Sequence, residues 1–300
     1  MVMIPYLMCF LNLYIHTYFQ FGTAMIPSLK HELDKLIRLF PLKKIRKVEL
    51  VIARDYIDAY VCPLSFDPFT PLEYKIILPK GNTDNIIGVL VHEYFHIFLG
   101  DRYDLCFVII SRCSDKEEDL FRNPLFKAIA RLASDFVVDY YASKLYPSYR
   151  EYLKYRLFKN LTLIKTIGES LSRKPDKYQQ EMVINIVSIA IYNLMIIEIL
   201  RKFLLMENQV VKEIQEISVE VLTRYIKANQ NRVKKIRNIL HELSRTGLSI
   251  ADKDPLRAFE FVLKVLTEYF FGIHVQLGAM KVLDPQTSEV LEIKCIKLVD

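Results

Sequence analysis

The spacing of apolar residues predicts a small sheet near the start of the chain and helices after it. Between Lys47 and Arg54 apolar and charged residues alternate, as in a half-buried strand. Two shorter apolar runs, Ala59 to Cys62 and Tyr74 to Leu78, are typical of further strands. From residue 123 onward most apolar residues recur every three or four positions, as on one face of a helix. The pattern predicts an α+β fold with a small mixed sheet followed by a mainly helical C-terminal part.

Capping residues and prolines mark where the predicted helices begin and end. Thr83 or Asp84 can cap a helix that should stop near Gly100. Asn123, followed by a proline, starts another helix, and Pro147 prevents that helix from continuing. The same signals predict helices at 27–40, 151–171, 255–271 and one that ends near 206, a break near 229–231, and a closing hairpin with its turn at 284–288.

Two apolar runs raise the question of a membrane. The first 29 residues contain no charged side chain, and their length permits an anchor. Polar residues such as Asn12 and Gln20 interrupt the run, and no basic segment precedes it. An anchor or interfacial helix, a buried helix, and an extension of a protein that begins at Met25 all stay open. The second run, Met182 to Ile197, is short and broken by polar residues, which favours a buried core helix.

Composition narrows the function classes. The five cysteines are scattered, odd in number and without a CxxC pair, so we expect neither a disulfide framework nor a cysteine zinc site. A reducing, cytoplasmic location fits best, and residues 1–24 leave membrane association open. The net charge of +6 is too mild to indicate nucleic acid as a partner. With only 8 glycines, a glycine-rich phosphate loop is not expected. Nothing in the sequence sets the oligomeric state.

The segment His92-Glu-Tyr-Phe-His96 carries the main chemical signal. On a helix, residues four apart share a face, so both imidazoles can bind one ion. Glu93 lies about 100° around the helix axis and can reach a water held by that ion. The plain alternative is a helix whose histidines only form local hydrogen bonds. The HExxH spacing favours a zinc hydrolase, which needs a third protein ligand.

Two aspartates on the helix that starts at Asn123 are candidates for completing such a site. Asp135 and Asp139 occupy a stripe of otherwise mostly apolar positions at spacings of three and four. A buried carboxylate is costly unless it is paired or binds a metal. We therefore expect Asp135 to be the third metal ligand and Asp139 to orient a ligating imidazole. The alternative is that both face solvent while Ile129, Phe136 and Tyr140 form the core face.

These residues resemble a known family of enzymes. HEYFH, followed about forty residues later by Asp135, Asp139, Ala142 and Leu145 before a proline, is similar to the gluzincin metallopeptidases, especially compact members and the ImmA/IrrE-type proteases. The resemblance implies a zincin-like fold and spans about residues 48–147. This chain departs from the pattern by having Asp instead of Glu as third ligand, which requires a closer approach of the two helices. The longer metzincin motif is absent, because Leu99 and Arg102 stand where it needs Gly and His.

The expected function is zinc-dependent hydrolysis of peptide bonds in a peptide or protein substrate. One Zn²⁺ per chain would activate a water, and Glu93 would act as general base. The expected organisation is a hydrophobic segment at 1–24, a zincin-like metallopeptidase domain at 25–207 and a helical subdomain at 208–300 that ends in a hairpin. The alternative is a non-catalytic zinc-binding regulatory or interaction protein with a vestigial protease site.

Two further features of the site are expected but only loosely specified. The strand just before the HExxH helix matches the edge strand on which such enzymes lay an extended substrate, and its residues are Tyr74, Lys75, Ile76, Ile77 and Leu78. A donor for the oxyanion is also expected. Nothing in the spacing selects among the candidates Tyr140, Tyr141 and His274, each of which is more often a packing residue.

Overall fold

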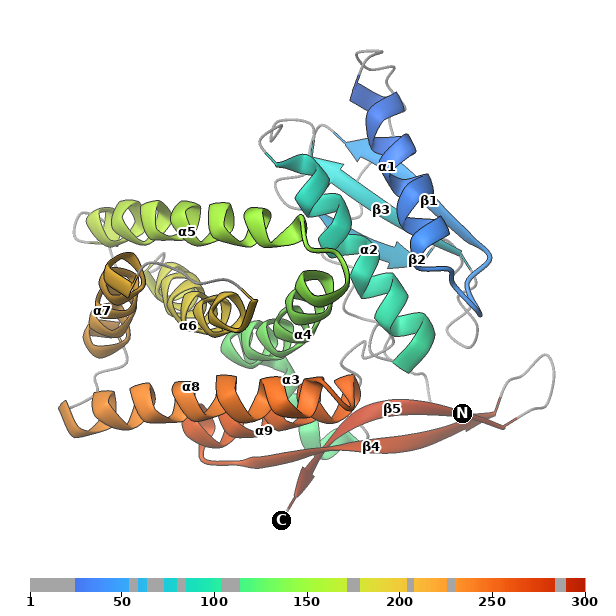
Figure 1. Ribbon diagram of the computed structural model, residues 1–300. Coiled ribbons are helices and arrows are strands. Elements are labelled where there is room, and N and C mark those ends of the chain that lie inside the picture. Colours follow the sequence, from blue (N-terminus) through green and yellow to red (C-terminus); the bar gives the residue numbers. More distant parts are fainter. Residues whose placement is uncertain are drawn as a thin grey trace. The chain divides into compact units, whose positions relative to one another are not determined.

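A computed structural model shows that the fold is α+β (Figure 1). The structure describes residues 25–53, 59–63, 73–79, 85–103, 114–171, 179–203, 208–225, 230–283 and 290–299. The chain forms two compact units, Met1–Arg102 and Tyr103–Asp300. The hydrophobic segment at 1–24, the caps proposed at 83 and 84, and the turn proposed at 284–288 lie outside the described residues. The domain boundary expected at 207/208 stays a prediction.

The first unit contains the small mixed sheet. Its described elements are α1 (Met25–Leu39), β1 (Lys47–Ala53), β2 (Tyr60–Pro63), β3 (Glu73–Pro79) and α2 (Ile86–Tyr103), whose last residue belongs to the second unit. The two helices and the three strands predicted for this part of the chain are confirmed. α1 buries one leucine stripe, Leu29, Leu33 and Leu36, at helical spacing.

The sheet order corrects one prediction. β3 lies between the other two strands, pairing in parallel with β1 and antiparallel with β2. Both sides of β3 are therefore hydrogen-bonded from Tyr74 to Ile77, so the strand from Tyr74 to Leu78 is not the edge expected for binding substrate. Pairing on both sides places β3 in the centre, where Tyr74 and the run from Ile76 to Pro79 are buried.

The second unit is helical apart from one hairpin. A short 3₁₀ turn at Asp115–Glu117 precedes its helices. They are α3 (Glu118–Arg122), α4 (Pro124–Leu145), α5 (Tyr149–Leu171), α6 (Gln179–Phe203), α7 (Asn208–Tyr225), α8 (Gln230–Ala251) and α9 (Pro255–Phe271). The predicted caps are present: the side chains of Asn123 and Asp254 accept hydrogen bonds from backbone amides at the starts of α4 and α9, and Gly272 ends α9 with φ of +67°.

α4 is the central helix of this unit. It contacts α3, α5, α6, α8 and α9, and it is buried on nearly every side between Phe126 and Ser143. Its burial matters for function because both candidate aspartates are on it. A carboxylate on such a helix cannot turn to water and must find partners inside the protein.

α6 is the most apolar helix. Within the described residues, Met182–Phe203 is the only helical segment long and apolar enough to cross a membrane. Two thirds (67%) of its apolar window is buried inside the structure, as in the core helix of a soluble protein.

A hairpin closes the described chain. β4 (His274–Leu283) and β5 (Val290–Val299) pair antiparallel, and β4 contacts α9 (Figure 1). Cys295 on β5 is buried and disulfide-bonded, although the cysteine pattern predicted no disulfide framework. The cytoplasmic location stays a prediction.

Candidate metal centre

His92 and His96 lie one turn apart on α2 and point their rings at each other. Their Nε2 atoms are 3.2 Å apart, and the rings stand nearly perpendicular, with an interplanar angle of 82°. Two nitrogens that bind one zinc at 2.0–2.1 Å with tetrahedral geometry are separated by about 3.3 Å. The pair is thus spaced as two ligands of a single zinc ion must be. The same distance also permits a hydrogen bond between the rings.

Glu93 follows His92 on the same helix and is buried with it, at 8% exposure. α2 is almost entirely apolar apart from these residues and its C-terminal end, and Leu90, Val91, Tyr94 and Phe95 are all buried. A carboxylate in such surroundings is costly to keep unless it has a chemical role or a partner. In the HExxH pattern this glutamate is the candidate general base.

The C-terminal half of α2 is fixed by hydrogen bonds to the segment that follows α1. The Asp101 carboxylate, only 1% exposed, accepts hydrogen bonds from the backbone amides of Lys43 (2.6 Å), Lys44 (2.6 Å) and Ile45 (3.0 Å). The Tyr94 hydroxyl donates to the carbonyl of Phe40 at 2.7 Å. These bonds set the rotation of the helix, and so the face on which both histidines stand.

Asp135 and Asp139 are both buried on α4. Asp135 is 8% exposed and Asp139 is fully buried. The alternative in which both aspartates face solvent is wrong, because both are buried; its other part is confirmed, since Ile129, Phe136 and Tyr140 are buried as well. α4 has no solvent face at this height, and the carboxylates are therefore retained in the interior despite their cost.

Asp139 is held by two tyrosines. Tyr149, at the start of α5, donates a hydrogen bond to its Oδ1 at 2.5 Å, and Tyr192 on α6 donates to its Oδ2. Burial and the charge of Asp139 raise the pKa of Tyr149 well above its usual value, so this donor keeps its proton. Each carboxylate oxygen can accept a second hydrogen bond. The expected contact of Asp139 with an imidazole stays a prediction.

Arg156 joins this cluster and was not identified from the sequence. One of its terminal nitrogens is 3.9 Å from Oδ2 of Asp135, and its guanidinium lies 4.5 Å from the centre of the Tyr192 ring. The polar cluster of the second unit thus contains the three charged residues Asp135, Asp139 and Arg156. The sequence offers one weak indication of its role: Tyr149 and Arg156 are seven residues apart and so share a face of one helix. Many surface residues have the same spacing, so it does not single out Arg156.

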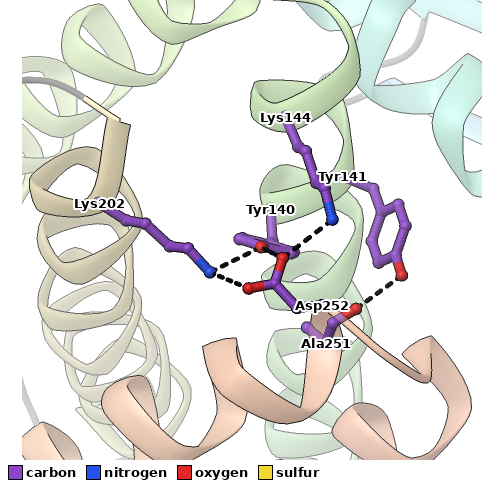
Figure 2. Close-up of polar contacts among 6 residues, drawn as sticks. All are labelled: Tyr140, Tyr141, Lys144, Lys202, Ala251 and Asp252. Carbon is purple, nitrogen blue, oxygen red and sulfur yellow. Dashed lines mark hydrogen bonds and ion pairs between the residues drawn. The ribbon is translucent and has the colours of Figure 1, made fainter.

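The tyrosines considered as oxyanion donors serve a different network (Figure 2). Tyr140 donates its hydroxyl hydrogen to Asp252, and Tyr141 donates to the carbonyl of Ala251 at 2.6 Å. Both hydrogens are already engaged in packing α4 against the end of α8. The third candidate, His274, is exposed on β4, 3.5 Å from Glu268. The oxyanion donor of the hypothesis is therefore not identified among these residues.

Lys144 and Lys202 complete the network in Figure 2. Lys144 donates to Asp252 at 2.9 Å, and Lys202 donates both to Asp252 and, at 2.8 Å, to the Tyr140 hydroxyl. Burial alone would raise the pKa of the Asp252 carboxyl, but hydrogen bonds from Lys202, Tyr140 and Lys144 outweigh it and hold that pKa well below its usual range. The network ties α4, α6 and α8 together.

The side chains suited to a metal are divided between the two units. His92 and His96 belong to the first, and Asp135 belongs to the second. Each of these three residues offers one side-chain atom of a kind that binds metal ions. Two imidazole nitrogens and one carboxylate oxygen form the donor set of a catalytic zinc site that keeps its fourth position for water.

Comparisons with known proteins give no family. No family model matches the chain, and neither the curated proteins nor the solved structures contain a match. The gluzincin resemblance therefore rests on the motif residues alone.

Proposed function

We propose that this protein is a zincin-like, zinc-dependent metallopeptidase. His92, His96 and Asp135 bind one zinc ion per chain, and Glu93 is the general base. The observation that carries the proposal is the 3.2 Å separation of the two histidine Nε2 atoms, because it is the separation that one tetrahedral zinc imposes on two ligands. It arises within the first unit alone and does not depend on the second.

Two buried carboxylates in the second unit fit the proposal. Asp135 and Asp139 are both buried on α4, and Arg156 lies 3.9 Å from Asp135. Burying a carboxylate is costly, and a metal ion bound to it offsets part of that cost. An aspartate that binds zinc would be one member of this cluster, and its neighbours would be its support.

The chemistry of peptide hydrolysis assigns a role to Glu93. Zinc, when bound, supplies a Lewis acid that activates water and polarises the scissile carbonyl. The Glu93 carboxylate takes the proton of the attacking water and delivers it to the leaving amine. A carboxylate is suited to both transfers because it is an acceptor when ionised and a donor once protonated.

The test is cleavage of a mixed peptide library, read by mass spectrometry, together with zinc content. We expect the wild-type protein to hold about one zinc per chain and to cleave, with cleavage stopped by a chelator and restored by zinc. Glu93→Gln should keep the zinc and lose activity by roughly three orders of magnitude or more. Glu213→Gln, at an exposed position of α7, is the matched control and should leave both unchanged.

Two outcomes would contradict the proposal in different ways. Stoichiometric zinc without any cleavage would favour the non-catalytic zinc-binding protein. Cleavage that survives Glu93→Gln would remove the general base from the mechanism. Fractionation of the full chain beside one that starts at Met25 would test whether residues 1–24 bring the protein to a membrane.

A further inference from the structure

We propose that Arg156 is a positioning residue that holds the Asp135 carboxylate in place as a metal ligand. The inference rests on the proposed function and adds a residue to it. It concerns α4, α5 and α6 of the second unit, where the relevant contacts are made.

The guanidinium of Arg156 is fixed from two sides. One terminal nitrogen, Nη2, lies 3.9 Å from Oδ2 of Asp135, which is ion-pair distance but too long for a hydrogen bond. Its guanidinium carbon lies over the Tyr192 ring, 4.5 Å from the ring centre. Tyr192 is itself anchored, because its hydroxyl donates to Asp139. Arg156 thus stands on a rigid support and faces the candidate ligand.

The other terminal nitrogen, Nη1, marks the residue as unusual. It is buried and makes no hydrogen bond within the part of the chain that the structure describes. An unsatisfied buried donor costs about 1–3 kcal/mol, and such groups are rare in folded proteins. An aliphatic side chain would cover Tyr192 without this cost. The retention of an arginine here is explained if its charge acts on the neighbouring carboxylate.

A short ligand needs such a neighbour. Aspartate reaches less far than the glutamate of the resembling enzymes, so a small rotation of its carboxylate removes the ligand atom from the metal. A cation near Oδ2 stabilises the ionised carboxylate, which is the form that would bind a metal, and opposes that rotation. Partners of this kind commonly change metal affinity 10- to 100-fold.

The experiment measures zinc affinity by competition with a chromophoric chelator, for wild type, Arg156→Met and Arg156→Lys. Arg150→Met is the matched control. Arg150 is on the same helix and also lies over an aromatic ring, 4.7 Å from the centre of Phe203, but its hydrogen bond goes to the backbone of Ser143. Circular dichroism confirms that each variant is folded before its affinity is compared.

We expect about a 10- to 100-fold loss of zinc affinity in Arg156→Met, a smaller loss in Arg156→Lys, and a change within about twofold in Arg150→Met. If Arg156→Met fails to fold, the zinc affinity of Arg156→Lys is the test instead, because lysine keeps the positive charge and loses the planar guanidinium. Wild-type affinity in the folded Arg156 variants, or an equal loss in Arg150→Met, would overturn this inference alone. A wild-type protein that binds no zinc would overturn the proposed function, and this inference with it.

Discussion

The Tyr149 hydroxyl lies 2.5 Å from Oδ1 of Asp139 and joins the start of α5 to the buried centre of α4. Tyr149→Phe removes the donor and leaves the carboxylate with less support. We expect unfolding free energy to fall by about 1–3 kcal/mol, because a buried acceptor loses a hydrogen bond. Urea denaturation measures this. Tyr155→Phe, on the same helix and partly exposed, should cost less than about 0.5 kcal/mol; an equal loss would assign the effect to helix packing.

Asp101→Asn tests what fixes α2. The substitution replaces one accepting oxygen by an NH₂ group, so at least one of the three backbone amides loses its partner and meets another donor. We expect a loss of about 1–3 kcal/mol in urea denaturation. Hydrogen exchange should show faster exchange at Lys43, Lys44 and Ile45. Unchanged exchange at these amides would show that Asp101 does not hold the segment.

Asp252→Asn should give a stability difference that depends on pH. The pKa of Asp252 is lowered on folding, so its stabilising effect is complete above the unfolded value of about 3.9 and is lost as the pH falls through the folded value. Because the carboxylate is more than a third exposed, we expect only about 1 kcal/mol at pH 7. The urea midpoints of wild type and variant should begin to converge below about pH 4 and approach each other further as the pH is lowered. A difference that stays constant with pH would contradict this role.

Features that depend on residues close together in the sequence were predicted correctly. The four-residue spacing of His92 and His96 requires only a helix, and α2 is helical. The apolar stripe that contains Asp135 and Asp139 correctly predicted their burial, because the apolar stripe of a helix faces the protein interior.

Features that depend on contacts between distant residues were not predicted from the sequence. Tyr192 meets Asp139 across 53 positions of the chain, and no local pattern specifies such a partner. The edge position assigned to Tyr74–Leu78 was wrong for a related reason. Alternation predicts a strand and its faces, whereas the order β1-β3-β2 depends on contacts between strands that are distant along the chain.

Zinc content after dialysis against metal-free buffer tests whether His92 and His96 bind one ion. It is measured for wild type, Glu93→Gln and the double variant His92→Ala, His96→Ala. We expect about one zinc per chain in the first two proteins and almost none in the third, because only the double variant lacks the two ligands spaced for one ion. A wild-type protein without zinc, or a double variant that still holds one zinc per chain, would contradict it.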